Sequence, residues 1–281
     1  MSVALETPTA AAAARVLGGA YQRLVGICEV LTAQVVQPGM TTPQRGVSGA
    51  ELTESREALD SFVEAEAARI QERHGHTARP HVAASRALHD YAWSVGLLMS
   101  GVWYLERRVP RIRPEDVRLD LATGVYGITP RSSLSCLPDD PAAALPGVTV
   151  LPHEESLRTE LRSAVADHMT PLLTALGPIT RRGSRALWGL VSDDLVSGIW
   201  YLGRVLGRED DAVRAATELL PSAVSPYPGG ADFRHLTDAS GRRHPTRTRA
   251  GCCLYYTIRP DEACSTCPRT CDTERLRRLE N

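Results

Sequence analysis

Near its C-terminus the chain carries the stretch CCLYYTIRPDEACSTC, residues 252–267, whose cysteines follow the spacing C-C-x10-C-x2-C. Five of the seven cysteines in the 281 residues lie within the last thirty, the fifth of them being Cys271. Thiolates are soft ligands, and four of them complete a tetrahedral zinc site or a [2Fe–2S] cluster. The spacing therefore predicts a cofactor site at Cys252, Cys253, Cys264 and Cys267, with the upstream helices holding it.

A disulfide framework fits the cysteine pattern poorly. Disulfide-rich chains are typically small secreted domains with distributed cysteines, whereas these cysteines are bunched in a longer chain. We also expect no secretory signal, because Glu6 and Pro8 interrupt any apolar run behind Met1.

Zinc and iron–sulfur both remain open from the spacing. Cys264-x2-Cys267 is a common zinc half-site, but its partner here is a pair of adjacent cysteines. Neighbouring side chains in an extended strand point to opposite faces, so Cys252 and Cys253 must lie on a bend if both coordinate. A two-iron cluster offers more positions for sulfur than one ion does. The spacing favours iron–sulfur and keeps zinc as the alternative.

Arginines surround the cysteines, and no acidic residue occurs between Gly241 and Pro260. Guanidinium groups near an anionic cluster stabilise its charge, and the planar fork of arginine suits carboxylate or hydroxamate oxygens. All 32 basic residues of the chain are arginine, which weakens any argument from arginine abundance. The substrate-binding candidates are Arg242, Arg243, Arg247 and Arg249.

The segments RAGCCLYY (residues 249–256) and CSTCP (264–268) resemble the C-terminal signature of the FhuF-type ferric-siderophore reductases. The resemblance implies that Cys252, Cys253, Cys264 and Cys267 bind a [2Fe–2S] cluster and that the protein reduces siderophore-bound ferric iron. Family members often carry Gly and Asp between the last two cysteines, where this chain has Ser and Thr. Cys271 lies outside the family pattern, so its role stays open.

Composition and charge exclude several classes of protein. The apolar content of 43% is normal for a globular chain, and a formal charge of −1 predicts no bulk attraction to nucleic acid. The longest mostly apolar run, residues 92–105, is too short to cross a bilayer. We therefore expect a cytoplasmic protein without an integral membrane segment, in a compartment that keeps thiols reduced.

Hydrophobic periodicity predicts a mainly α fold with a small antiparallel β-sheet, of the α+β class. The expected helices cover residues 10–36, 53–73, 80–108, 152–176 and 182–206, followed by a shorter helix that ends at Leu220. The expected strands are 117–121, 125–128 and 147–150, with a loop over 130–146. Cys28 and His168 fall on apolar helix faces, so we predict both as buried core residues. Cys136, in the expected loop, is predicted to be unliganded.

An internal repeat links two of the expected helices. SRAL at residues 85–88 leads to SGVWYL at 100–105, and SRAL at 184–187 leads to SGIWYL at 197–202. The repeat predicts two related helical halves, with Trp103 and Trp200 in the core. The expected domains are an N-terminal helical half with a small β insertion (1–150), a second helical half (151–240) and a C-terminal cluster-binding segment (241–281).

These observations predict a ferric-siderophore reductase that passes one electron through a [2Fe–2S] cluster to ferric iron. No dinucleotide fingerprint of the G-x-G-x-x-G type opens a helix, so electrons must come from an external donor such as a ferredoxin or flavin reductase. Two alternatives stay open. One is an iron–sulfur electron-transfer component of siderophore or natural-product biosynthesis, and the other is a zinc-stabilised binding protein.

Overall fold

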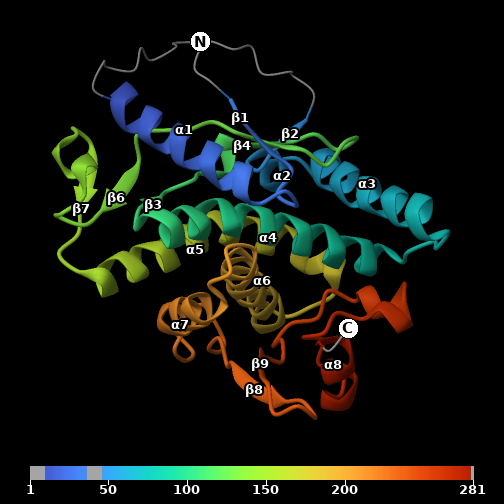
Figure 1. The fold of residues 1–281 in the computed structure, drawn as a ribbon. Helices are drawn as coiled ribbons and strands as arrows, with labels where there is room; N and C mark the ends of the chain where they lie inside the picture. The colour runs from blue at the N-terminus through green and yellow to red at the C-terminus, as the bar shows by residue number, and fades with distance from the viewer. Residues whose placement is uncertain (1–9, 37–45, 280–281) are drawn as a thin grey trace. The chain divides into compact units, whose positions relative to one another are not determined.

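The computed structural model describes residues 10–36 and 46–279 (Figure 1). The expectation of no secretory signal rests on Glu6 and Pro8, which lie outside these residues. The helices are α1 (Ala10–Ile27), α2 (Glu51–Glu54), α3 (Arg56–His74), α4 (Pro80–Glu106), α5 (Glu154–Thr180), α6 (Ser184–Val205), α7 (Glu209–Leu219) and α8 (Asp272–Leu279). The strands are β1 (Ala33–Val35), β2 (Val47–Ser48), β3 (Val109–Pro110), β4 (Val117–Leu119), β5 (Tyr126–Ile128), β6 (Leu134–Cys136), β7 (Val148–Val150), β8 (Arg234–Thr237) and β9 (Arg243–Thr246). The predicted α+β class is confirmed.

The chain folds into two compact units that are interleaved along the sequence. One unit takes residues 1–61 and 94–172, and the other takes residues 62–93 and 173–281. The boundaries fall within α3, α4 and α5. The predicted domains instead follow sequence order, with boundaries at residues 150 and 240, and they stay a prediction. The whole predicted cluster-binding segment, 241–281, belongs to the second unit.

The first unit contains two small sheets. One has the strand order β1-β5-β4-β2 and the other β3-β6-β7. The predicted pair β4 and β5 is antiparallel, but β1 pairs with β5 and β7 with β6 in parallel. The sheets are therefore mixed rather than purely antiparallel, because strands distant in sequence join the predicted local pair.

The first predicted helix, residues 10–36, is wrong beyond Ile27. Backbone bonds from Leu31 to Cys28 and from Ala33 to Leu31 turn the chain after α1. Residues 33–35 then pair with Tyr126–Ile128 as β1. Leu24 and Leu31 are both buried, which explains the helix-like spacing in the sequence even though the second of them lies past the helix.

The residues predicted to lie in the core are buried. Cys28 is fully buried, as predicted. Cys136, which was predicted only to be unliganded and to lie in a loop, is also fully buried and lies in β6. His168 is 2% exposed, and its Nδ1 lies 3.0 Å from the carbonyl oxygen of Ile112. Because a carbonyl only accepts, the ring donates this bond. Trp103 and Trp200 are also buried, as predicted, while a duplication behind the repeat stays a prediction.

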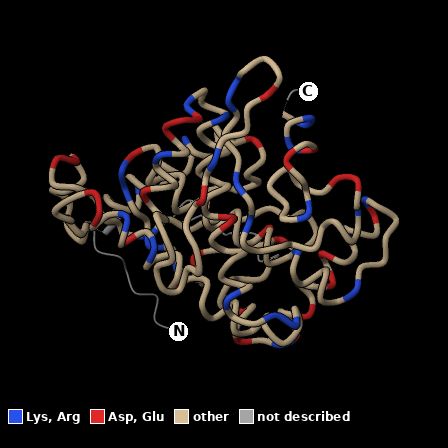
Figure 2. The backbone as a smooth tube through the Cα atoms, turned by 90° about the horizontal axis from the view of Figure 1, so that it is seen from below, with Lys and Arg blue, Asp and Glu red and all other residues tan. Residues whose placement is uncertain are grey.

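The second unit is organised around α6, most of whose residues from Leu187 to Gly203 are buried. Helix α7 packs closely on it, because a Cβ added at Gly203 would lie 2.2 Å from that of Ala212. Strands β8 and β9 form an antiparallel hairpin, and α8 contacts β8 (Figure 1). Figure 2 shows acidic and basic residues interspersed along the chain rather than separated into blocks. None of the described helices is long and apolar enough to cross a membrane.

Candidate metal centre

The four cysteines of the C-C-x10-C-x2-C pattern line one hollow in the second unit. Its volume is about 260 Å³ when the part open to solvent is counted. Cys253 and Cys267 are buried, Cys252 is half-buried and Cys264 is exposed. The other lining residues are Arg249, Gly251, Tyr255, Tyr256, Ala263 and Pro268. Cysteines eleven to fifteen positions apart in the sequence are thus brought to one place.

The adjacent pair Cys252 and Cys253 is followed by a sharp change in backbone direction. Leu254 has φ +64°, in the left-handed region that non-glycine residues rarely adopt, and a 3-10 turn, Tyr255–Thr257, follows it. The amide of Leu254 donates to Cys252 Sγ at 3.4 Å. Both cysteines line the same hollow, as the predicted bend requires.

The second pair lies on a tight turn. The amide of Cys267 donates to the carbonyl of Cys264 at 2.9 Å, and both residues line the hollow. Between them, Thr266 accepts a backbone bond from Arg249 at 3.0 Å. This bond ties the segment that precedes Cys252 to the turn that holds the other pair.

The three remaining cysteines lie elsewhere. Cys28 and Cys136 belong to the first unit, whereas the five C-terminal cysteines belong to the second. Cys271 is exposed and does not line the hollow. The structure therefore separates the four cysteines of the pattern from the other three.

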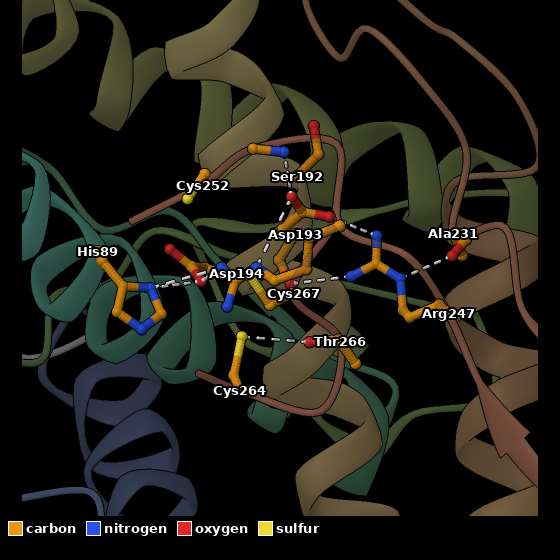
Figure 3. A network of polar contacts seen from close by, with 12 residues as sticks. His89, Ser192, Asp193, Asp194, Ala231, Arg247, Cys252, Cys264, Thr266 and Cys267 are labelled. Carbon is orange, nitrogen blue, oxygen red and sulfur yellow. Dashed lines mark hydrogen bonds and ion pairs between the residues drawn. The ribbon is translucent and has the colours of Figure 1, made fainter. Parts of the chain in front are cut away.

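Helix α6 holds the segment that carries the four cysteines, called the cysteine loop below. It does so through two adjacent carboxylates, Asp193 and Asp194, both 0% exposed (Figure 3). Asp193 Oδ1 lies 2.5 Å from Nη2 of Arg247, and Oδ2 accepts from the amide of Gly251 at 2.6 Å. Asp194 pairs with Arg249 and lies 2.7 Å from Nδ1 of His89 on α4. Buried carboxylates require partners of this kind because an unpaired buried charge is very costly.

Gly251 is held directly against the backbone of α6. A Cβ at this position would lie 2.5 Å from the amide nitrogen of Leu190 and 2.9 Å from the carbonyl carbon of Gly189. Only glycine permits this approach, which brings the amide of residue 251 to Asp193. The glycine of the R-A-G-C-C segment thus positions the first cysteine pair.

A buried arginine on α8 joins the two ends of the loop. Arg275 is 2% exposed and donates to three backbone carbonyls. The carbonyls belong to Arg247 at 3.0 Å, Cys267 at 2.9 Å and Thr270 at 3.1 Å. One side chain thereby satisfies acceptors on both sides of the cysteines, which makes the loop geometry depend on α8.

Another arginine reaches the site from α4. Arg86 lies near enough to Cys253 to interact electrostatically with its sulfur, and its guanidinium carbon lies 5.3 Å from the ring centroid of Tyr255. Its carboxylate partners are Asp90 at 2.9 Å and Glu66 at 4.0 Å. A cation near a ligand sulfur influences the energy of a bound anionic cofactor.

The substrate-binding candidates separate into two pairs. Arg242 and Arg243 are exposed on the β8–β9 hairpin, whereas Arg247 and Arg249 are 1% and 8% exposed and engaged by carboxylates. Arg249 does line the hollow, but Arg247 does not. A guanidinium buried like that of Arg247 cannot contact a siderophore, so we do not propose Arg247 as a substrate-binding residue.

Asp193, Asp194, Arg86 and Arg275 are supporting residues that were not predicted from the sequence. A signal for the aspartates was present, because two adjacent acidic residues interrupt the otherwise apolar segment LWGLVSDDLVSGIW, residues 187–200. Acidic residues on a buried helix require cations, and the arginine-rich segment supplies them. Arg86 belongs to the first SRAL repeat, which predicted only related helical halves, and nothing in the local sequence marks Arg275 among the many other arginines.

The electrostatics and donor set of the hollow fit an anionic, thiolate-ligated cofactor. Burial raises the pKa of the Cys252 and Cys264 thiols, and the neighbouring thiols raise it further, so metal binding must displace protons. The buried Nε of Arg249 donates no hydrogen bond within the described part of the chain. In those same residues, no set of three or more His, Cys, Asp or Glu is arranged as a ready site for a metal ion.

Residues 249–269 match the family model described as the FhuF 2Fe-2S C-terminal domain. No curated protein matches the chain. The match confirms the resemblance in this segment, which contains all four cysteines of the hollow. The chain therefore carries a FhuF-type 2Fe-2S domain, and its cofactor is a [2Fe–2S] cluster.

Proposed function

We propose that the protein is a ferric-siderophore reductase in which Cys252, Cys253, Cys264 and Cys267 hold the [2Fe–2S] cluster. The observation that carries the proposal is that these four sulfurs line one solvent-open hollow within the matched segment. The cluster supplies a one-electron couple that takes an electron from an external donor and reduces siderophore-bound Fe(III) to Fe(II). Siderophore oxygen donors hold ferric iron more tightly than ferrous iron, so reduction favours release.

The residues around the hollow have distinct roles in this proposal. Gly251, Asp193 and Arg275 fix the backbone on both sides of the segment that carries the four cysteines. Arg86 and Arg249 place positive charge beside Cys253 and on the wall of the hollow. Cys264 is the one exposed residue among the four cysteines, so a siderophore or a donor can approach the cluster from its side. A ferredoxin or flavin reductase is the proposed donor, and the cytoplasm is the proposed location.

The test begins with protein purified anaerobically from cells grown with iron. We expect about two irons and two acid-labile sulfides per chain and a visible spectrum that dithionite bleaches. Reduced protein is then mixed with ferric siderophores, and Fe(II) is trapped by a ferrous-specific chelator. Stoichiometric zinc without sulfide would support the binding-protein alternative. A redox-active cluster that reduces no ferric siderophore would support the biosynthetic electron-transfer alternative.

A further inference from the structure

The buried arginines at the hollow are already balanced by carboxylates. Arg247 forms an ion pair with Asp193 of α6, and Arg249 forms one with Asp194. On α4, Arg86 lies 2.9 Å from Asp90 and 4.0 Å from Glu66. These cations are paired with acids that are buried, or half-buried in the case of Asp90, and little of their charge is left to attract a ligand from solvent.

Two further arginines contact lining residues of the hollow and have no carboxylate within ion-pair distance among the described residues. Arg182 donates from Nη1 to the carbonyl oxygen of Cys252. The guanidinium carbon of Arg269 lies 4.1 Å from the ring centroid of Tyr256, and the side chain is exposed. Glu262, an acidic residue close to the lining, is engaged by Arg259 and by the hydroxyl of Tyr255.

We infer that the surface beside the cluster-holding hollow selects ferric chelates of net negative charge. Arg182 and Arg269, which contact lining residues but do not themselves line the hollow, are the residues that contact the oxygen donors of the chelate. The inference rests on the proposed function and names the substrate class for it. A guanidinium is planar, stays charged at all relevant pH values and pairs in bidentate fashion with carboxylate or catecholate oxygens.

Charge explains why such cations are needed at this place. An oxidised [2Fe–2S] cluster with four thiolates carries a net charge of −2, which repels an anionic chelate. Arg182 and Arg269 offset this repulsion next to the lining residues Cys252 and Tyr256. Arg242 and Arg243, on the β8–β9 hairpin, contact no lining residue of the hollow among the described contacts. We therefore assign the selection of anionic chelates to Arg182 and Arg269 rather than to Arg242 and Arg243.

The test measures binding of redox-inert gallium(III) chelates to the oxidised, cluster-loaded protein by calorimetry. Ga(III) has nearly the size and the charge of Fe(III) but is not reduced under these conditions. An anionic carboxylate–catecholate complex is compared with a cationic trihydroxamate complex. We expect tighter binding of the anionic complex, with the preference lost near 1 M salt, where the screening length is about 3 Å.

The variants are Arg269→Gln and Arg182→Gln, with Arg269→Lys as the conservative change. Each Gln variant should weaken binding of the anionic complex by about tenfold and leave the cationic complex unchanged, and Lys should restore most of the affinity. Arg185→Gln is the matched control, because Arg185 is exposed on α6 and contacts no lining residue among the described contacts. It should bind both chelates as the unmodified protein does.

Three results would overturn the inference. They are equal affinity for the two chelates, an equal loss for both in the Gln variants, and a loss in Arg185→Gln as large as in Arg269→Gln. The proposed function fails separately. If the anionic gallium complex binds with the expected preference but the reduced protein leaves its ferric counterpart unreduced, the reductase proposal falls and the binding site stands. Equal reduction rates and equal binding for both chelates would support the reductase proposal and contradict the inference that anionic chelates are selected.

Discussion

The backbone amide of Gly251 donates a hydrogen bond to Oδ2 of Asp193 at 2.6 Å. The other oxygen of the same carboxylate lies 2.5 Å from Arg247. One buried side chain of α6 therefore holds the loop at two points just before Cys252. The place where the first cysteine pair begins is set by a helix more than fifty residues earlier in the chain.

Gly251→Ala should displace the cysteine loop. Its Cβ would lie 2.5 Å from the amide nitrogen and 2.7 Å from the Cα of Leu190, and backbone atoms at these positions cannot swing away. We expect a destabilisation of about 1–3 kcal/mol, as for overpacked sites, and a large drop in iron and sulfide per chain. Urea unfolding and metal analysis measure the two effects.

Gly18→Ala is the control for this substitution. Gly18 lies in α1, and beyond its own helix and chain neighbours a Cβ there would meet only the side chain of Pro130, at an ordinary 3.7 Å. The change should keep the cluster and stabilise the protein by roughly 0.5–1 kcal/mol, because Ala is the better helix residue. Full cluster content in Gly251→Ala would show that the contact with α6 does not position the cysteines.

The long helices were predictable because burial on one face repeats over many turns. The expected 80–108 and 182–206 correspond to α4 (Pro80–Glu106) and α6 (Ser184–Val205). Strands β1, β2 and β6 are only two or three residues long, too short for a period-two pattern to appear. Their pairing is decided by distant partners, as when Ala33–Val35 joins β5.

The cysteine pattern was also predictable because ligand spacing is local in the sequence. The supporting shell was not, because its contacts span long sequence separations. Arg247 and Asp193 are 54 residues apart, and Arg249 and His89 are 160 apart. The sequence contains arginines and acids in excess of those that pair here, and only the fold decides which of them meet.

The three cysteines outside the hollow should be dispensable for the cofactor. Replacing Cys28, Cys136 and Cys271 with serine leaves all four lining sulfurs in place. We expect unchanged visible and EPR spectra and unchanged iron content, with some loss of stability because Cys28 and Cys136 are fully buried. An altered spectrum in the Cys271→Ser single variant would show that this exposed thiol takes part in ligation.

His168 makes stability depend on pH. Burial lowers the pKa of His168 to about 4, so the unfolded chain, with a pKa near 6.5, binds the proton more readily. The contribution of neutral His168 to the free energy of unfolding is therefore fully present above pH 6.5. It falls as the pH drops toward 4, by about 3 kcal/mol in all. Urea unfolding at several pH values measures this slope. His168→Gln keeps an amide donor for the carbonyl of Ile112 and should flatten it, whereas an unchanged slope would assign the effect to other groups.

Arg86 should raise the reduction potential of the cluster. Its charge near Cys253 favours the more negative, reduced state, because a cation beside a ligand sulfur stabilises added negative charge. Arg86→Gln should lower the midpoint potential by on the order of tens of millivolts, about 59 mV being a tenfold effect for one electron. Arg86→Lys should lower it less. A redox titration followed by EPR measures both.

Arg69→Gln is the matched control for this prediction. Arg69 pairs with the same buried carboxylate, Glu66 at 3.0 Å, but no contact with a cysteine is described for it. Removing the Arg69 charge alters the surroundings of Glu66 but leaves Arg86 near Cys253, so the reduction potential of the cluster should shift little. Equal shifts in Arg69→Gln and Arg86→Gln would mean that long-range charge, rather than proximity to the sulfur, sets the potential. An unchanged potential in Arg86→Gln, with the cluster fully loaded, would remove Arg86 from the set of residues that tune it.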